Sequence, residues 1–185
     1  MAINFRGWSY FYEFSYRRSI GSASFFEIAS VLGYPLPNAN LLFYVFNLAA
    51  LGLVLLYLTK SKKVISIAEG SFFTMFAFIL FNKQYSMQYV IWLAGLAVLA
   101  ISRLNQKHQM NIVYLYAIWQ ASELAFQFGF FQNILTGMNP TTTSPAISGL
   151  AFGVIGAIRY LLAIGFAVVL AKYLYVEKTA EVAKK

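Results

Sequence analysis

The chain has 185 residues, of which 60% are hydrophobic and only 11% are charged, and its mean hydropathy is +0.65. Soluble domains of this length are about half apolar and about a quarter charged, so the composition argues for a membrane protein. With no cysteine and a single histidine, the sequence excludes a disulfide framework, a thiolate metal site and a multi-histidine site, and we predict no metal. The net charge of +8 is typical of lysine-rich loops that face anionic lipid, so we predict no nucleic-acid partner.

Residues 1–38 are predicted to be an extracytoplasmic juxtamembrane segment that contains an amphipathic helix. Ser24 and Glu27 form the S-x-x-E pattern of a capping box. Apolar residues then recur at helical spacing: Phe25, Ile28, Ala29 and Leu32. Gly33 is a natural stop for this helix. An aromatic stretch upstream ends in Arg17 and Arg18, a combination that favours the headgroup layer, so we expect an interfacial helix.

Residues 39–175 are predicted to be an all-α transmembrane domain. A helix needs about 20 mainly apolar residues to cross the hydrocarbon layer. Five segments are candidates: residues 40–58, 64–81, 87–101, 112–131 and 147–173. The second contains Glu69, but the short third segment needs it in order to start from the far side. We therefore expect a bundle of five transmembrane helices, followed by a polar cytoplasmic tail at 176–185.

The positions of the basic residues orient this predicted bundle. One side carries most of them: Lys60, Lys62, Lys63, Arg103, Lys107, Lys172, Lys178, Lys184 and Lys185. The other side carries Arg6, Arg17, Arg18 and Lys83. Because cytoplasmic loops are rich in lysine and arginine, we expect the C-terminus in the cytoplasm. The N-terminus and the loop around Lys83 then lie outside a plasma membrane or an endoplasmic-reticulum-like membrane.

The most informative stretch is 81–93, which reads FNKQYSMQYVIWL. A lysine, side-chain amides and several hydroxyl groups meet where the second predicted span turns back as the third. A flexible ammonium such as that of Lys83 suits a phosphate group. The alternative is an ordinary interfacial turn, in which Tyr89 and Trp92 anchor the chain at the membrane boundary.

This stretch resembles the F-N-K-x-x-S-x-Q-Y-x-x-W-L signature in the C-terminal part of GT-C membrane glycosyltransferases. It is most similar to mannosyltransferases that use a polyprenyl-phosphate sugar, such as the first mannosyltransferase of GPI-anchor synthesis and its prokaryotic relatives. The matching residues are Phe81, Asn82, Lys83, Ser86, Gln88, Tyr89, Trp92 and Leu93. Met87 replaces the usual proline. The resemblance extends over about residues 12–101, because the segment with the arginine pair is also similar.

The resemblance implies a polyprenyl-phosphate (dolichyl-phosphate-like) sugar donor bound by Lys83 with Arg17 or Arg18. Asn82, Gln88 and Tyr89 would position its head group or the lipid entry. GT-C enzymes carry a catalytic acidic residue, usually aspartate, in their first lumenal loop, and this chain has no aspartate. The resemblance does not align Glu13 or Glu27 with that base. The chain therefore resembles the C-terminal half of such an enzyme; we identify no cofactor, and a divalent metal would belong to the missing half.

A second group of polar residues falls within the fourth and fifth predicted spans. Gln120, Glu123 and Gln127 share one helix face, and Arg159 lies within about one turn of Glu123 in depth. Charges at membrane depth are rare and usually paired. We predict a structural ion pair between Glu123 and Arg159, although a proton or ion path would use the same residues. Polar residues within other spans, Asn47 and Glu69, are predicted to form interhelical hydrogen bonds.

Three functional hypotheses follow from these observations. The first is a membrane module of a lipid-linked-sugar glycosyltransferase, acting on the extracytoplasmic face with a protein partner that supplies the catalytic loop. The second is a non-catalytic membrane subunit or scaffold that binds lipid or a partner. The third is a small transporter that uses Glu123 and Arg159, for which we find no inverted repeat or pair of broken helices.

Overall fold

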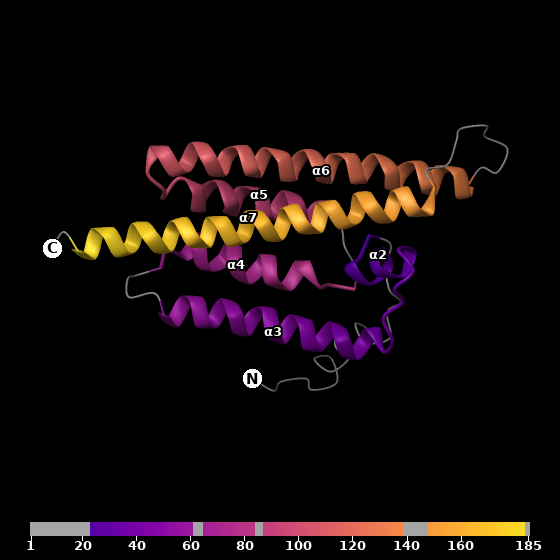
Figure 1. Cartoon of the computed structure of the whole chain (residues 1–185), viewed down its shortest axis with the longest axis horizontal. Helices are drawn as coiled ribbons and strands as arrows, with labels where there is room; N and C mark the ends of the chain where they lie inside the picture. The colour runs from indigo at the N-terminus through magenta and orange to yellow at the C-terminus, as the bar shows by residue number, and fades with distance from the viewer. Residues whose placement is uncertain (1–22, 61–64, 84–86, 139–147, 184–185) are drawn as a thin grey trace, which may run out of the picture.

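The regular secondary structure in the described part of the chain is all α-helix, as the sequence predicted. In a computed structural model, residues 23–60, 65–83, 87–138 and 148–183 are described, and they contain six α-helices and no strand (Figure 1). The helices are α2 (Phe25–Val31), α3 (Ala39–Lys60), α4 (Ile67–Leu80), α5 (Met87–Ile101), α6 (Gln106–Met138) and α7 (Gly149–Ala183). α7 continues to Ala183, so most of the predicted tail at 176–185 is helical.

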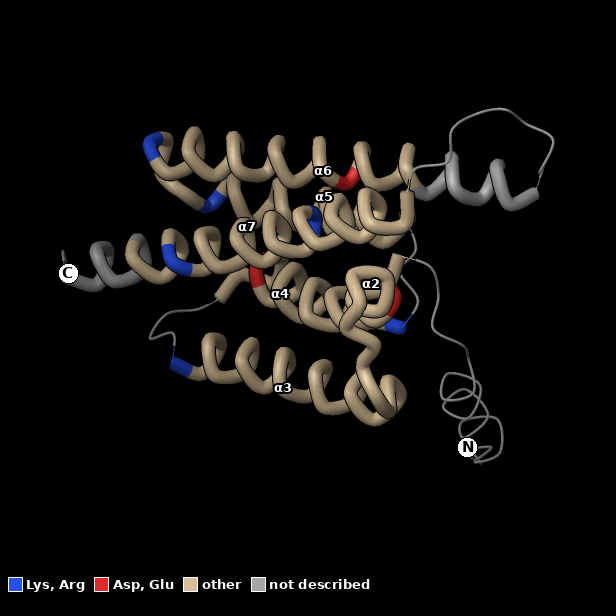
Figure 2. Tube along the Cα trace, turned by 45° about the vertical axis from the view of Figure 1, so that its right-hand side comes forward, with Lys and Arg blue, Asp and Glu red and all other residues tan. Residues whose placement is uncertain are grey.

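The five longer helices lie side by side and alternate in direction (Figure 1). α7 packs against α6 and α2, while α4 packs against α3 and α5. α2 lies where α3 and α7 begin, and we call this end of the bundle the α2 end. The opposite end, which we call the lysine end, is where α3 and α5 end and α6 begins, and Figure 2 shows most of the basic residues there. Lys60, Arg103, Lys107 and Lys172, from separate parts of the chain, are thus gathered toward one end of the bundle.

Among the described residues, two helices are long and apolar enough to cross a membrane, Ala39–Lys60 and Gly149–Val176. α4 and α5 have 14 and 15 residues, which is about 21 to 23 Å at about 1.5 Å per residue. This length is below the roughly 30 Å of a hydrocarbon core. α4 begins at Ile67, whereas the second predicted span begins at residue 64. The structure itself supports membrane association through two helices, fewer than the five spans that the sequence predicted.

Aromatic side chains from α4, α6 and α7 form the centre of the bundle. Phe72, Trp119 and Phe166 are almost fully buried. The rings of Trp119 and Phe166 stack with their centroids 5.2 Å apart, and Phe72 meets Phe166 edge-on at 5.8 Å. Such pairs contribute about 0.5–1.5 kcal/mol beyond the area that they bury. α4, although it is the shortest of the five, thus contributes several side chains to the core of the bundle.

The predicted start and end of α2 are confirmed. The Ser24 hydroxyl accepts a hydrogen bond from the Glu27 N–H at 3.2 Å, and the Glu27 carboxylate accepts one from the Ala23 N–H at 2.6 Å. Gly33 has a φ of +88°, which glycine adopts without steric cost. Tyr34 and Gly33 donate N–H groups to the carbonyls of Ala29 and Ser30, respectively, which is a Schellman motif.

The apolar face of α2 packs on protein rather than lying open at a membrane surface. Phe26 and Ile28 are buried, and Phe26 stacks on Phe46 of α3. Two glycines on α7, Gly153 and Gly156, allow this close approach: a Cβ at Gly156 would lie 2.3 Å from the Ile28 Cδ1 atom. α2 is therefore an integral part of the bundle, which the amphipathic pattern alone did not indicate.

Candidate functional site

Lys83 lies just after α4, at the α2 end of the bundle. Its ammonium donates a hydrogen bond of 2.8 Å to Oδ1 of Asn40 and lies 5.5 Å from the centroid of the Phe43 ring. The residue is only 3% exposed. Burial lowers the pKa of the Lys83 amine below its ordinary value, because a low-dielectric environment disfavours the charged form. The site is thus a cation held between the first turns of α3 and the end of α4.

The remaining residues of the predicted phosphate site are only partly described. The backbone N–H of Asn82 donates to the carbonyl of Ile79 at 3.2 Å, and this bond helps to turn the chain after α4. The Tyr89 ring lies 5.4 Å from that of Trp92, on α5. The side chain of Gln88, together with Arg17 and Arg18, lies outside the described residues.

Sequence reasoning missed the two residues of α3 that contact Lys83. Asn40 and Phe43 lie 43 and 40 positions away in sequence, and the hydrogen bond to Asn40 joins the start of α3 to the turn after α4. The available signal was a polar residue, Asn40, at the start of an otherwise apolar helix. This signal indicates that Asn40 needs a hydrogen-bond partner, but it does not indicate which residue that partner is.

The structure brings Glu123 and Arg159 together, with 3.7 Å between Nη1 of Arg159 and Oε2 of Glu123. Both residues are buried. Oε1 of Glu123 accepts a hydrogen bond of 3.1 Å from the Trp119 indole. The guanidinium also lies over two rings, with its Cζ 4.0 Å from the centroid of Phe126 and 4.5 Å from that of Tyr160. Arg159 is therefore enclosed by charge, hydrogen-bonding and aromatic contacts.

The same arginine holds the start of α2. Nη2 of Arg159 donates a hydrogen bond of 2.8 Å to the carbonyl of Ala23, and the Tyr160 hydroxyl donates to the same carbonyl at 3.2 Å. Ala23 is buried and has a φ of +72°, which is unusual for a residue other than glycine. Arg159 thus links α7 to α6 through Glu123 and to α2 through Ala23. This arrangement is that of a structural clamp.

Two further polar residues of the predicted spans make interhelical hydrogen bonds. The Tyr57 hydroxyl of α3 donates to Oε1 of Glu69 in α4 at 2.5 Å. The amide of Asn47 donates to the carbonyl of Phe81 at 3.3 Å and to the carbonyl of Phe43, within its own helix, at 2.8 Å. Both contacts join α3 to α4, one toward each end of the bundle, and they satisfy polar groups that would otherwise be costly in an apolar surrounding.

A metal site finds no support in the part of the chain that the structure describes. No group of three or more His, Cys, Asp or Glu side chains there is arranged to hold a metal ion. The carboxylates of Glu27, Glu69 and Glu123 instead accept hydrogen bonds from Ala23, Tyr57 and Trp119, respectively. These three acidic residues are thus engaged in structural contacts.

Comparisons with known proteins assign no family. No protein-family model matches the chain, and neither a curated protein nor a solved structure matches it.

Proposed function

We propose that this chain is the membrane module of a lipid-linked-sugar glycosyltransferase that is similar to mannosyltransferases of the GT-C type. It binds a polyprenyl-phosphate sugar at the extracytoplasmic face and requires a partner that provides the acidic catalytic loop. The observation that carries this proposal is the desolvated ammonium of Lys83, held by Asn40 at the α2 end of the bundle. Lys83 is also the central residue of the F-N-K sequence on which the resemblance rests.

The proposal includes five membrane crossings with the lysine end in the cytoplasm. α4 and α5 run alongside the two long apolar helices, in alternating directions (Figure 1). They can cross with these helices although they are short, because the bilayer accommodates a short span by thinning locally. Lys60, Arg103, Lys107 and Lys172 support the orientation, because positive residues favour the cytoplasmic side.

Burial makes Lys83 a suitable group for binding a phosphate. Two unit charges about 4 Å apart attract by roughly 1 kcal/mol in water but by roughly 4 kcal/mol at the effective dielectric of a protein surface. The hydrogen bond to Asn40 orients the ammonium. Arg17 and Arg18 belong to the proposed site because the resemblance implies it; both lie outside the described residues.

The catalytic base must come from elsewhere. Glycosyl transfer to a hydroxyl acceptor needs a group that accepts the proton of the attacking hydroxyl. Glu27 is an acidic residue at the α2 end, but its carboxylate caps α2 through the Ala23 N–H. A partner with an acidic loop would supply the base and any divalent metal, while this chain would bind and orient the lipid.

A non-catalytic membrane subunit is the second candidate. The observation that favours it is that Glu27, Glu69 and Glu123 all make structural hydrogen bonds. In that case the Lys83 site would bind a lipid phosphate or a partner without turnover. A transporter is a weaker candidate, because the contacts of Glu123 with Arg159 and Trp119 are those of a static clamp.

Native mass spectrometry of the purified protein tests the proposal. The probes are undecaprenyl phosphate and the neutral alcohol undecaprenol, and the variants are Lys83→Ala, Lys83→Arg and the distal control Lys107→Ala. We expect the wild type to retain the phosphate at least tenfold better than the alcohol. Lys83→Ala should abolish this preference, and Lys83→Arg should restore it in part because a planar guanidinium does not reproduce a compact ammonium. Lys107→Ala should behave as wild type.

Equal retention of the phosphate and the alcohol by the wild type would refute the phosphate site. Turnover distinguishes the two candidates. The chain alone should transfer no sugar, and activity should appear when a partner with a lumenal acidic loop is added. Phosphate binding without turnover in the presence of such a partner would favour the non-catalytic subunit.

A further inference from the structure

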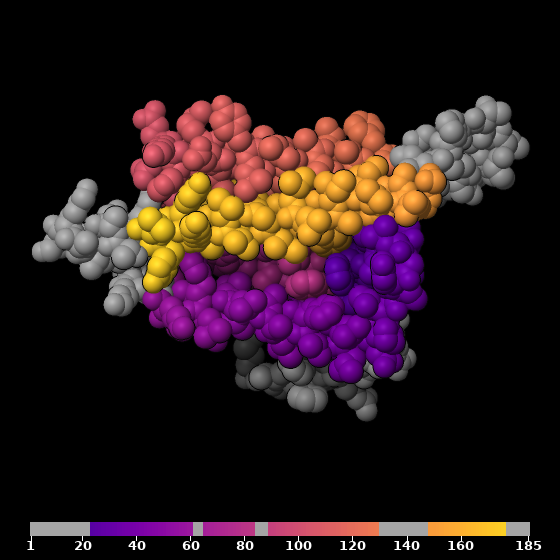
Figure 3. All heavy atoms as spheres, viewed as in Figure 1, coloured from indigo at the N-terminus to yellow at the C-terminus, as the bar shows by residue number. Residues whose placement is uncertain are grey.

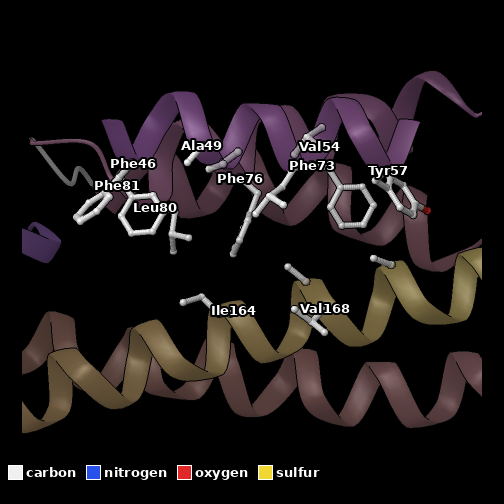
Figure 4. A pocket seen from close by; sticks show the side chains of 15 residues that line it. Phe46, Ala49, Val54, Tyr57, Phe73, Phe76, Leu80, Phe81, Ile164 and Val168 are labelled. Atoms are coloured by element: carbon white, nitrogen blue, oxygen red, sulfur yellow. The ribbon is translucent and has the colours of Figure 1, made fainter. Parts of the chain in front are cut away.

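An apolar cleft lies between α3 and α7, with α4 at its base. Its volume is about 450 Å³, which falls within the roughly 300–1,000 Å³ of small-molecule sites. Figure 3 shows α4 between the two outer helices, and Figure 4 shows side chains of all three helices pointing into the space. Every lining residue is apolar except Tyr57, whose hydroxyl is bonded to Glu69. The cleft offers hydrocarbon contacts and almost nothing to hydrate.

The cleft is long and runs parallel to the helices. On α3 its lining extends from Phe46 to Tyr57, eleven positions that cover about 16 Å at about 1.5 Å per residue. Across the gap, Ile164 and Val168 of α7 line it and are themselves exposed on the outer surface of the bundle. A long, narrow, apolar ligand that lies along the bundle axis matches this shape.

One end of the cleft adjoins the Lys83 site. Phe46 and Phe81 line that end, and their rings are 5.3 Å apart. Phe81 precedes Lys83 by two residues, and Phe46 follows Phe43, whose ring lies 5.5 Å from the ammonium, by three residues. The Lys83 ammonium thus lies beside residues that neighbour this end of the cleft, although Lys83 itself does not line it. This arrangement is complementary in charge and polarity to a lipid with a phosphate head.

We infer that this cleft binds the polyisoprenoid tail of the same lipid whose phosphate lies at Lys83. This inference rests on the proposed function for the identity of the lipid, while the cleft supplies the position and length of the tail. Small side chains such as Ala50 and Ala167 line it together with aromatic rings. The small side chains leave room for the methyl branches of an isoprenoid chain, and the aromatic rings give that chain a broad apolar contact surface. The tail would also fill the gap between α3 and α7.

A matched pair of substitutions on α3 tests the cleft directly. Ala50→Phe places a ring inside the cleft, which Ala50 lines. Gly52→Phe places the same ring two residues away, where an added Cβ meets nothing within 4 Å. Native mass spectrometry then compares undecaprenyl phosphate, undecaprenol and geranyl phosphate, which has the head group but only two isoprene units. Val168→Trp, on the α7 side of the cleft, is a second filling variant, for use if Ala50→Phe does not fold.

We expect Ala50→Phe to weaken retention of both undecaprenyl compounds at least tenfold, whereas Gly52→Phe leaves it unchanged. Geranyl phosphate should be retained weakly, and that retention should depend on Lys83 and not on Ala50. Equal effects of Ala50→Phe and Gly52→Phe would overturn the inference. Displacement of undecaprenyl phosphate by an equal concentration of dipalmitoyl phosphatidate would overturn it as well, because the occupant would then be an acyl chain.

The same data separate failure of the tail site from failure of the proposed function. If Lys83→Ala abolishes the preference for phosphate while Ala50→Phe has no effect, the phosphate site stands and the tail lies elsewhere. If undecaprenol and undecaprenyl phosphate bind equally well and both are lost in Ala50→Phe, the tail site stands and the phosphate site fails.

Discussion

The clamp formed by Glu123 and Arg159 gives the sharpest prediction about stability. Glu123→Gln and Arg159→Gln each remove one charge from a buried pair and leave the other uncompensated. At 3.7 Å, two unit charges attract by about 4 kcal/mol at an effective dielectric of about 20. Breaking one side of a buried pair typically costs about 3–5 kcal/mol. The separation of Nη1 and Oε2 exceeds that of a charge-assisted hydrogen bond, so we expect the lower half of this range for Glu123→Gln.

Arg159→Gln should cost more than Glu123→Gln. The arginine also donates to the Ala23 carbonyl and stacks on Phe126, and glutamine reproduces neither contact. A glutamine at position 123, by contrast, keeps an oxygen that can accept from the Trp119 indole. The double variant should recover about 1–3 kcal/mol relative to the sum of the single losses, which is the usual size of coupling between residues in direct contact.

The assay is unfolding in mixed micelles by titration with a denaturing detergent, which gives the free energy of unfolding for all four proteins. Losses that add within about 0.5 kcal/mol would show that the two residues do not interact. A larger loss for Glu123→Gln than for Arg159→Gln would contradict the role of Arg159 as the clamp between α2, α6 and α7.

Three further predictions concern other contacts. Gly156→Leu should displace α2 and lower stability by about 1–3 kcal/mol through overpacking, whereas Gly165→Leu, where an added Cβ meets open space, should be nearly neutral; equal losses in thermal unfolding would refute the close packing of α2. Retention of undecaprenyl phosphate should fall as pH rises through the lowered pKa of Lys83, because binding needs the charged ammonium. Lys83→Arg should remove this pH dependence, since arginine stays protonated. The same pH profile for the wild type and Lys83→Arg would contradict this prediction. Tyr57→Phe removes the donor to Glu69 and should cost about 1–3 kcal/mol, and an unchanged free energy of unfolding would show that the bond contributes nothing.

Local signals predicted the parts of the fold that depend on neighbours in sequence. The capping box at Ser24 and Glu27 and the stop at Gly33 describe α2 correctly, because capping involves residues within one or two turns. The segment 87–101 matches α5. The proximity of Glu123 and Arg159 followed from counting depth along two spans, because antiparallel helices of known rise fix which residues lie at the same level.

Contacts that depend on how the helices pack could not be predicted from the sequence. The carbonyl of Ala23 receives Arg159 from 136 positions away, and only the glycines at 153 and 156 let α2 approach α7. The bond between Asn40 and Lys83 likewise requires α3 and the end of α4 to be neighbours. Amphipathic spacing showed that α2 has an apolar face, but it did not reveal that protein rather than lipid covers that face.

Cysteine labelling tests the central claim, a five-span bundle with Lys83 at its outer end, and the chain has no native cysteine to remove. Single cysteines replace Ser86, between α4 and α5, Ser148, before α7, and Gln106, at the start of α6. In intact cells or sealed vesicles of native orientation, an impermeant maleimide should react at positions 86 and 148 from outside, and at position 106 only after permeabilisation. Protection at 86 together with reaction at 148 would show that α4 and α5 do not cross the membrane. Reaction at 106 alone would reverse the orientation and place Lys83 in the cytoplasm.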